Sequence, residues 1–391
     1  MAKNDSKKII SKDNWVSNFT LIGVPKITEH TFKIDQKSEK SNWIYNSMSL
    51  GVDCGEKFGT VYSEIMGGYS DEGQNVIYAH GKNDDGTDDF KTQIQVDWDD
   101  RFNDDVLESI GDLSFITVGL EKTDKGKTYY KKFLSAYDAI AYIKEHLTEN
   151  MVVNVKGNLK YSMYQENVQV RKNITSIVLS KVDDASKYVA QFMQTILIDK
   201  TSASLKNIDK NKSVMYVDAR VLDYLKEYNG IEVKGQFPYN KRFEFPMDFN
   251  NEAQCKKIMD KVFKVKKGIT QITFVGEFIE GGAVVTTTWD DVPEDIKDLV
   301  ECKVYTREEA LAVCSSNGNR EQRMLLIRPH VKVVGEEKKP VLQIFEEKYT
   351  EEDLVLDYIY ASKPDNNDDE EDEDDDVESS DDDGMSWLNA L

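Results

Sequence analysis

Lysine and arginine alternate with aromatic residues at three places in the chain, and a fourth group is purely aromatic. A surface that binds single-stranded nucleic acid without regard to sequence needs cations for the phosphates and flat rings on which bases stack. In chain order the groups are Trp43, Tyr45 and Tyr62; Lys127, Tyr129, Tyr130, Lys131 and Lys132; Lys160, Tyr161, Tyr164, Arg171 and Lys172; and Tyr239, Lys241, Arg242 and Phe243. We predict that these residues contact DNA. The alternative, that many rings cap a β-core with their polar ends in water, stays open at this point.

Residues suited to catalysis are sparse. The four histidines stand alone, with no spacing suited to zinc, and no phosphate-binding or nucleophile motif appears. The carboxylates of Asp97, Asp99 and Asp100, with those of Asp104 and Asp105, could chelate Mg²⁺ as a nuclease requires, but clustered aspartates in a polar insertion more often form a solvated loop. We therefore predict no enzyme activity, no cofactor and no metal. A nuclease that uses the Asp97 cluster remains a less favoured alternative.

The acidic residues are concentrated in two islands. The chain carries 50 Lys+Arg against 72 Asp+Glu, a formal charge of -22. Residues 364–391 hold 14 acids and no Lys or Arg, and residues 84–105 hold nine acids against Lys91 and Arg101. The rest of the chain is close to neutral, so the low pI does not prevent that part from meeting an anion.

Residues 364–391 are predicted to be a disordered acidic tail, because so charged a segment cannot bury enough apolar surface to offset its ordering entropy. Its tip is apolar and includes Trp387, Leu388 and Leu391. We predict that these three residues bind a partner protein at the end of a flexible tether. A solubility tail with an incidental tip is the alternative.

One pattern of predicted elements occurs twice. Ser135 is a plausible N-cap for a helix over 135–147, which is followed by a strand over 152–161 with an internal Gly157 and a hairpin partner over 168–179. A helix over 251–264, a strand over 272–278 with Gly276 and a return strand over 283–289 repeat this order, and short strands at 128–133 and 241–245 precede the helices. With three strands upstream of each helix, the pattern predicts an internal duplication. We expect a basic leader (1–14), two domains (15–182 and 188–363) and the tail.

Five strands with a helix between the third and fourth are the order of an OB-fold, a Greek-key barrel that binds oligonucleotides. We predict a mainly β fold with some α: two OB-fold-like domains. Residues 152–180, VVNVKGNLKYSMYQENVQVRKNITSIVLS, resemble the second half of the OB-fold in bacterial and phage single-stranded DNA-binding proteins, and the tail is similar to theirs. Bacterial members end in Pro-Phe and carry one OB-fold per chain, whereas this chain ends in Asn-Ala-Leu and repeats the fold. The resemblance therefore implies a phage-type, tandem-domain variant.

The expected function is to bind and protect single-stranded DNA during phage DNA replication, recombination or repair, with the tail competing with DNA and recruiting partners. An acidic DNA-mimic or interaction protein is the alternative. No signal peptide or membrane-spanning run is visible, and the four widely spaced cysteines fit reduced thiols. We therefore expect a cytoplasmic protein.

Overall fold

The computed structural model describes residues 10–355, except for 40, 165–166, 183, 229–230, 282–288, 290–291, 303–305, 308–309, 311–320 and 335–337. The predicted tail and its tip residues Trp387, Leu388 and Leu391 lie outside the described residues, as does most of the basic leader.

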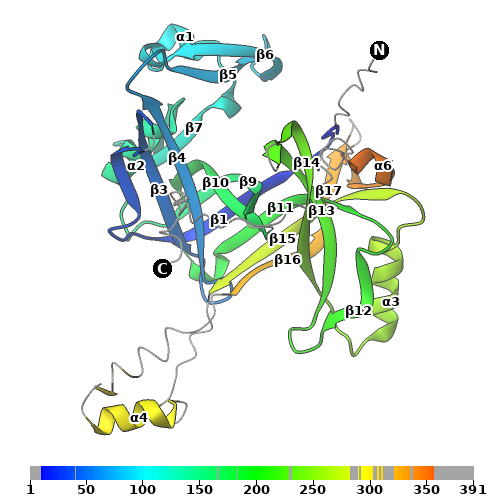
Figure 1. Cartoon of the computed structure of the whole chain (residues 1–391). Coiled ribbons are helices and arrows are strands. Elements are labelled where there is room, and N and C mark those ends of the chain that lie inside the picture. Colours follow the sequence, from blue (N-terminus) through cyan, green and yellow to red (C-terminus); the bar gives the residue numbers. More distant parts are fainter. Residues whose placement is uncertain are drawn as a thin grey trace, which may run out of the picture. The chain divides into compact units, whose positions relative to one another are not determined.

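Five strands close a first barrel (Figure 1). They are β1 (Ser17–Lys26), β3 (Trp43–Asp53), β4 (Thr60–Ser70), β9 (Val153–Tyr164) and β10 (Asn167–Leu179). β1 pairs with β3 and β9, β3 pairs with β4, and β10 closes the ring by pairing antiparallel with β9 and parallel with β4. Helix α2 (Ala136–His146) lies between the third and fourth strands, and the Ser135 side chain caps it by accepting a hydrogen bond from the Tyr137 amide. This is the strand and helix order of an OB-fold.

A second barrel repeats this arrangement. Its strands are β11 (Val189–Ile198), β13 (Val214–Tyr228), β14 (Ile231–Pro246), β15 (Ile269–Gly281) and β16 (Glu321–Pro329). β11 pairs with β13 and β15, β13 with β14, and β16 pairs antiparallel with β15 and parallel with β14. Helix α3 (Glu252–Ile258) and a π-helical turn (Met259–Phe263) precede the fourth strand, as α2 does in the first barrel.

The two barrels also share one register, which is clearest at the glycine inside each fourth strand. Gly157 lies opposite Phe19 of β1, and Gly276 lies opposite Phe192 of β11. A Cβ at Gly157 would come within 2.7 Å of the Phe19 ring, and one at Gly276 within 2.1 Å of the Phe192 ring. Any side chain at either position would therefore collide with the ring of the first strand.

The same correspondence holds around both rings. The pair Val24–Asp53 matches Leu197–Arg220, the parallel contact Glu64–Asn173 matches Glu244–Leu325, and the β-bulge at residues 174–176 matches the one at 326–328. Two closed barrels with identical pairing and an identical bulge confirm the predicted fold class and the duplication.

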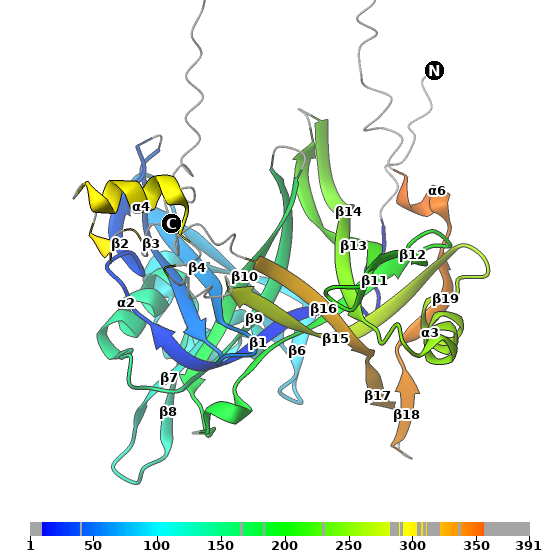
Figure 2. The same ribbon diagram turned by 90° about the horizontal axis from the view of Figure 1, so that it is seen from below.

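The barrels join through their first strands. β1 and β11 pair antiparallel from Ser17–Gln194 to Ile22–Val189, with Phe19 opposite Phe192, so one hydrogen-bonded sheet runs through both barrels. The β9–β10 hairpin of the first barrel also stands next to the long β13–β14 hairpin of the second (Figure 2). There the Asp223 side chain accepts a hydrogen bond from the Tyr161 amide at 2.8 Å.

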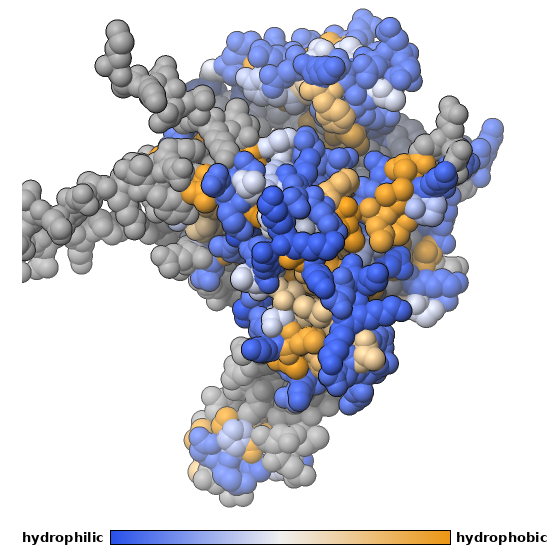
Figure 3. Space-filling model, turned by 90° about the vertical axis from the view of Figure 1, so that its right-hand side faces the viewer, coloured by the Kyte–Doolittle hydropathy of each residue, from blue (hydrophilic) through white to orange (hydrophobic). Residues whose placement is uncertain are grey.

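The remaining elements decorate the barrels. β2 (Phe32–Lys37) pairs with β3, β12 (Ala203–Asp209) with β13, and β7 (Ile116–Lys122) and β8 (Thr128–Phe133) extend the sheet beyond β10. The turn η3 (Ala185–Lys187) connects the barrels, and α4 (Glu294–Glu301) follows β15. After β16 come β17 (Val331–Val334), β18 (Lys339–Leu342), β19 (Ile344–Tyr349) and α6 (Glu351–Leu354). Figure 3 shows a mostly hydrophilic face with separate hydrophobic patches.

The acidic island 84–105 is folded, and the expectation of a solvated loop is wrong. It belongs to a small module made of β5 (Val76–Lys82), β6 (Asp88–Asp97), η1 (Trp98–Asp100), α1 (Asp104–Glu108) and η2 (Asp112–Ser114). Ala79, Val96, Ile110, Phe115 and Leu134 form its own hydrophobic core. Along β6, Ile94 and Val96 pack toward this core, while Gln93, Gln95 and Asp97 lie on the exposed side of the strand. Asp88 is largely buried and lies 3.1 Å from His80.

Two details of the predicted repeat differ from the structure. The predicted hairpin partner of β15 is the strand over 283–289, but in the structure β15 pairs with β16, which begins only at Glu321. Residues 283–288 lie outside the described residues. The short strands at 128–133 and 241–245 are not equivalent either. The first is the added strand β8, and the second is the end of the barrel strand β14. No helix in the described part of the chain is both long and apolar enough to cross a membrane.

Candidate nucleic-acid interface

The outward side of β3 and β4 in the first barrel, here called the β3–β4 face, is where OB-folds bind oligonucleotides. Its cross-strand pairs are Trp43–Ser70, Tyr45–Gly68, Ser47–Met66, Ser49–Glu64 and Gly51–Tyr62. The alternate residues Met48, Leu50, Val52, Val61 and Ile65 are buried in the barrel core. Strand alternation therefore turns all three predicted aromatic residues, Trp43, Tyr45 and Tyr62, to the same side of the sheet.

Two of these rings lie opposite a glycine. A Cβ on Gly51 would sit 3.2 Å from the Tyr62 ring, and one on Gly68 would sit 2.8 Å from the Tyr45 Cβ. Each tyrosine therefore packs against bare backbone of the neighbouring strand. Trp43 and Tyr62 are 37% and 39% exposed, and Met66 between them is 63% exposed. The face thus presents apolar and aromatic side chains to solvent, with Gly51, Gly68 and the serines as small neighbours and with the Glu64 carboxylate between Met66 and Tyr62. Exposed rings of this kind are suited to stacking bases.

Basic side chains lie beside this face on the β9–β10 hairpin. Arg171 of β10 is 3.8 Å from Glu64 of β4, so it borders the β3–β4 face directly. Lys160 lies opposite Arg171 across the hairpin, and its ammonium is 3.8 Å from Asp223. Farther along the same outward row, Tyr164 is 45% exposed. The structure therefore brings Lys160, Tyr164 and Arg171 together on one side of the hairpin.

The predicted cluster on β8 is divided between the two sides of the β7–β8 ribbon. Lys131 lies over the Tyr142 ring of α2 at 4.6 Å, and Tyr129 shares that side. Tyr130 packs against Gly119 of β7, and Lys132 pairs with Asp112 at 2.9 Å. Tyr129 and Tyr130 are about half exposed, and Lys127 is exposed at the tip. Neighbouring residues of a strand point to opposite sides, so this group cannot act as one surface.

Five predicted contact residues point inward, and this orientation argues against their direct contact with DNA. Tyr161, Lys172, Tyr239, Lys241 and Phe243 occupy the inward positions of their strands, and all except Lys241 are buried. The Tyr161 hydroxyl donates a hydrogen bond to Gln194 at 3.0 Å, and burial raises its pKa. Burial and the nearby Lys172 charge lower the pKa of Lys241. Tyr161, Lys172 and Lys241 lie at the junction between the barrels, whereas Tyr239 and Phe243 belong to the buried core of the second barrel.

Arg242 is the only outward member of the predicted group on β14. Its guanidinium donates to both carboxylate oxygens of Asp218, at 2.7 and 3.0 Å. The Asp218 hydrogen bond raises the Arg242 pKa. Arg242 is therefore exposed but already paired on the sheet surface.

The carboxylates proposed for a nuclease are not assembled. Asp97 accepts a hydrogen bond from Gln74, and Arg101, in the middle of the acidic segment, pairs with Asp138 of α2 at 2.8 Å. Within the described ranges no group of three or more His, Cys, Asp and Glu side chains could hold a metal ion.

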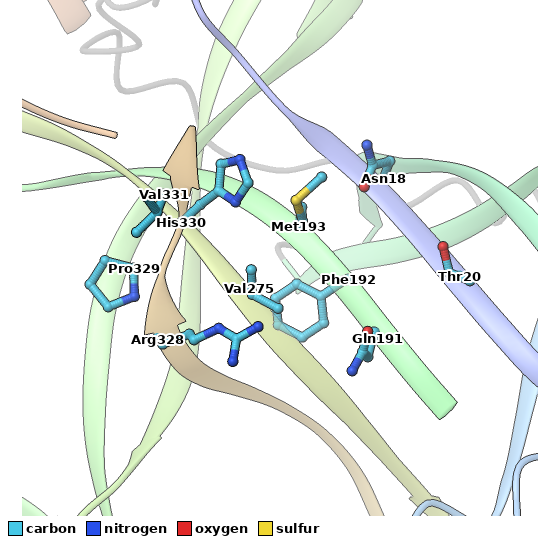
Figure 4. Close-up of a pocket in the computed structure, with 10 residues that line it drawn as sticks. All are labelled: Asn18, Thr20, Gln191, Phe192, Met193, Val275, Arg328, Pro329, His330 and Val331. Atoms are coloured by element: carbon cyan, nitrogen blue, oxygen red, sulfur yellow. The ribbon is translucent and has the colours of Figure 1, made fainter. Parts of the chain in front are cut away.

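A pocket of about 570 Å³ at the seam between the barrels was not foreseen from the sequence (Figure 4). Its walls are Asn18, Thr20, Gln191, Phe192, Met193, Val275, Arg328, Pro329, His330 and Val331, which come from β1, β11, β15, β16 and the start of β17. It depends on the β1–β11 pairing, which no local sequence pattern signals.

Comparison with known proteins places the chain in a family. A family model described as YorF matches residues 77–275, which is half of the chain. The chain belongs to the YorF family. The matched range begins in β5 and ends in β15, so it contains α2, the β9–β10 hairpin and most of the second barrel of this YorF member, whereas the β3–β4 face precedes it.

Other comparisons are more distant. No curated protein matches the chain. Among solved structures, a crystal structure of a deletion mutant of the single-stranded DNA binding protein from Thermus aquaticus is similar, with 8% identity over 86% of this chain and 98% of that chain, and a TM-score of 0.33. A likeness this distant says nothing about what this YorF member binds.

Proposed function

We propose that this protein binds single-stranded DNA and has no catalytic role. The observation that carries the proposal is the β3–β4 face: a closed barrel with OB topology presents Trp43, Tyr45, Tyr62 and Met66 on the side through which such barrels bind oligonucleotides. A water-exposed aromatic row with small neighbours gains from contact with bases. Each stacked base is worth about 1–3 kcal/mol and needs no particular sequence.

The basic residues next to the face supply the second half of the chemistry. Arg171 and Lys160 continue outward from β4 onto the β9–β10 hairpin, where Tyr164 offers another exposed ring. Lys160 lies 3.8 Å from Asp223 and Arg171 lies 3.8 Å from Glu64, and a bound phosphate would compete with these carboxylates for the two cations. A strand lying over Tyr62 would have its backbone near Arg171.

The biological role that we propose is protection of single strands during phage DNA replication or recombination. In this role residues 364–391 would compete with phosphates for the basic residues, and Trp387, Leu388 and Leu391 would bind a replication partner. The composition of the segment supports competition, because 14 acids on one tether act over roughly a Debye length, about 10 Å at 0.1 M salt. Deleting residues 364–391 should then tighten DNA binding at low salt and change little at high salt.

Titration of labelled oligo-dT across salt concentrations tests the proposal. We expect tighter binding to oligo-dT than to duplex, with affinity that falls as salt rises because counterions are released from the phosphates. Tyr62→Ala should weaken binding by about 1–3 kcal/mol per base lost and leave the salt slope unchanged. Tyr78→Ala is the matched control, because Tyr78 is 62% exposed but lies on the acidic module.

Absent binding, or equal affinity for duplex, would refute the proposal. It would instead favour the DNA-mimic or interaction protein, for which the folded acidic module is the supporting observation: its carboxylates stand on an ordered scaffold with its own core. Cleavage of the oligonucleotide in the presence of Mg²⁺ would support the nuclease alternative.

A further inference from the structure

We propose that only the first of the two duplicated barrels binds the DNA strand, because an ion pair in the second barrel replaces the aromatic site. This inference rests on the proposed function and assigns its site within the chain. It follows from comparing the two barrels position by position.

The shared register makes the comparison unambiguous. The parallel contacts Glu64–Asn173 and Glu244–Leu325 align Glu64 of β4 with Glu244 of β14. Two residues earlier, Tyr62 therefore aligns with Arg242. Tyr62 pairs with Gly51 of β3, and Arg242 pairs with Asp218 of β13. The pairing of the first strands gives the same alignment. Val24 of β1 pairs with Asp53 of β3 at the position where Leu197 of β11 pairs with Arg220 of β13.

At this shared position the two barrels have opposite chemistry. In the first barrel a tyrosine ring packs over a glycine and remains exposed. In the second, the Arg242 guanidinium is bound by both oxygens of Asp218 and lies 5.3 Å from the ring centroid of Tyr216. Even if a phosphate displaced Arg242, the Asp218 carboxylate would remain on the sheet and repel it. The arginine also lies over the ring of Tyr216.

The other arginines of the second face are paired as well. Arg220 donates to Asp199 at 3.1 Å and to Glu351 at 2.9 Å, and Arg323 donates to Glu244 at 2.7 Å. Together with Arg242 and Asp218, this face carries three guanidiniums and four carboxylates. The first barrel has Arg171–Glu64, 3.8 Å apart, at the position of Arg323–Glu244, and it has no counterpart there of the Arg242–Asp218 pair, because Tyr62 and Gly51 occupy those positions.

The second face is also shorter at the end where the first is most aromatic. β13 begins at Val214, which aligns with Ser47, so β13 has no counterpart of Tyr45 and Trp43. Each chain should therefore hold one short oligonucleotide, bound by the first barrel.

Exchanging the two cross-strand pairs in the full-length chain tests this inference. One variant, Gly51→Asp with Tyr62→Arg, installs the ion pair in the first barrel. The reciprocal variant, Asp218→Gly with Arg242→Tyr, installs the aromatic pair in the second. The probe is a labelled oligo-dT of about eight nucleotides, within the roughly 4–16 that one OB-fold covers. Affinity is measured by fluorescence anisotropy and stoichiometry by calorimetry, with circular dichroism to verify folding.

The parent should bind one oligonucleotide per chain. The first variant should lose affinity about 5- to 150-fold, which corresponds to the stacking of one base. The reciprocal variant should keep the parent affinity and gain weak binding of a second oligonucleotide. Tyr62→Phe, which keeps the ring, should behave like the parent. Photocrosslinking of bromodeoxyuridine oligonucleotides to the unmodified chain gives an independent check, with crosslinks expected in β3 and β4.

Two oligonucleotides bound by the parent, or crosslinks in β13 and β14, would overturn this inference while leaving the proposed function intact. An unchanged affinity in the first variant would do the same. No binding by the parent at any salt concentration would instead overturn the proposed function, and the inference with it.

Discussion

The buried ion pair between Lys172 and Glu280 should be the strongest single polar contribution to the junction of the barrels. Lys172 lies on β10 of the first barrel and Glu280 on β15 of the second, with side chains 9% and 3% exposed. The Glu280 amide also donates to the Phe58 carbonyl at 2.9 Å, and the Tyr62 amide lies 3.4 Å from a Glu280 carboxylate oxygen. The Lys172 ammonium is 4.8 Å from the Phe278 ring, so little water reaches it.

Replacing Glu280 by Gln should therefore destabilise the chain by about 3–5 kcal/mol, the usual cost of removing one partner of a buried pair. It leaves the buried Lys172 ammonium without its carboxylate partner and close to Lys241, whose pKa is lowered by burial and, secondarily, by the Lys172 charge. Lys172→Met should cost less, because the Glu280 carboxylate still has the Tyr62 amide 3.4 Å away. The double variant Lys172→Met with Glu280→Gln should be more stable than the sum of the single losses predicts.

Equilibrium unfolding in urea, followed by tryptophan fluorescence, measures these free energies. The matched control is the pair Lys57–Glu277, 2.7 Å apart, in which Glu277 also lies on β15. Lys57 lies in the turn between β3 and β4 and is 62% exposed, so this ion pair is in contact with water. Lys57→Met should cost at most about 1 kcal/mol, as exposed pairs do. Two results would contradict the reasoning from burial. One is that Glu280→Gln lowers the free energy of unfolding no more than Lys57→Met does. The other is that the losses of Lys172→Met and Glu280→Gln simply add up in the double variant, because water must then reach the Lys172–Glu280 pair.

Two further predictions concern the barrel core. Gly157→Ala and Gly276→Ala should each lower the free energy of unfolding by about 1–3 kcal/mol, because the new methyl group meets a phenylalanine ring and a backbone carbonyl. Gly235→Ala is the control: its Cβ would meet nothing closer than 3.6 Å, so chemical denaturation should show almost no change. Stability should also fall as the pH rises from about 10 to about 12. Burial, and secondarily Asp223, raises the pKa of Tyr239 to about 12 from 10.0, so the unfolded chain loses this proton first and stability is lost within that window. Unfolding midpoints measured across this range should decline less steeply in Tyr239→Phe, and an unchanged decline would show that Tyr239 ionises freely in the folded chain.

Local signals predicted much of the barrel architecture. The Ser135 cap and the apolar spacing located α2, and a glycine inside an alternating strand located both Gly157 and Gly276. Partner choice between distant strands was harder. A long insertion separates β15 from β16, so the nearest apolar run after β15, residues 283–289, is the partner that the sequence pattern predicts. The β1–β11 pairing depends on tertiary packing and has no local signature.

The inward tyrosines and lysines could have been recognised from strand alternation. Tyr161 is in phase with Val153, Val155 and Leu159, all of which are buried, so its side chain had to point into the barrel. Tyr239 and Phe243 are likewise in phase with the buried Val233 and Phe245 on β14. Grouping residues by nearness in sequence mixed both sides of each strand. If the same residues are grouped by the side of the strand to which they point, every second residue together, the residues that face solvent separate from those that face the barrel interior.

The side to which a residue points also explains where the two copies have stayed alike and where they have diverged. Positions that face the interior must preserve the barrel, and both copies keep a glycine beneath the phenylalanine of the first strand and the same bulge in the fifth. Positions that face solvent do not affect closure, so Gly51–Tyr62 and Asp218–Arg242 can differ completely without changing the register. The register is the same in both barrels, so the exposed Tyr62 ring and the paired Arg242 occupy equivalent positions on two different surfaces. If the first barrel alone binds DNA, as we propose, the second barrel can hold it in place, and the Lys172–Glu280 contact provides such an attachment next to Tyr62.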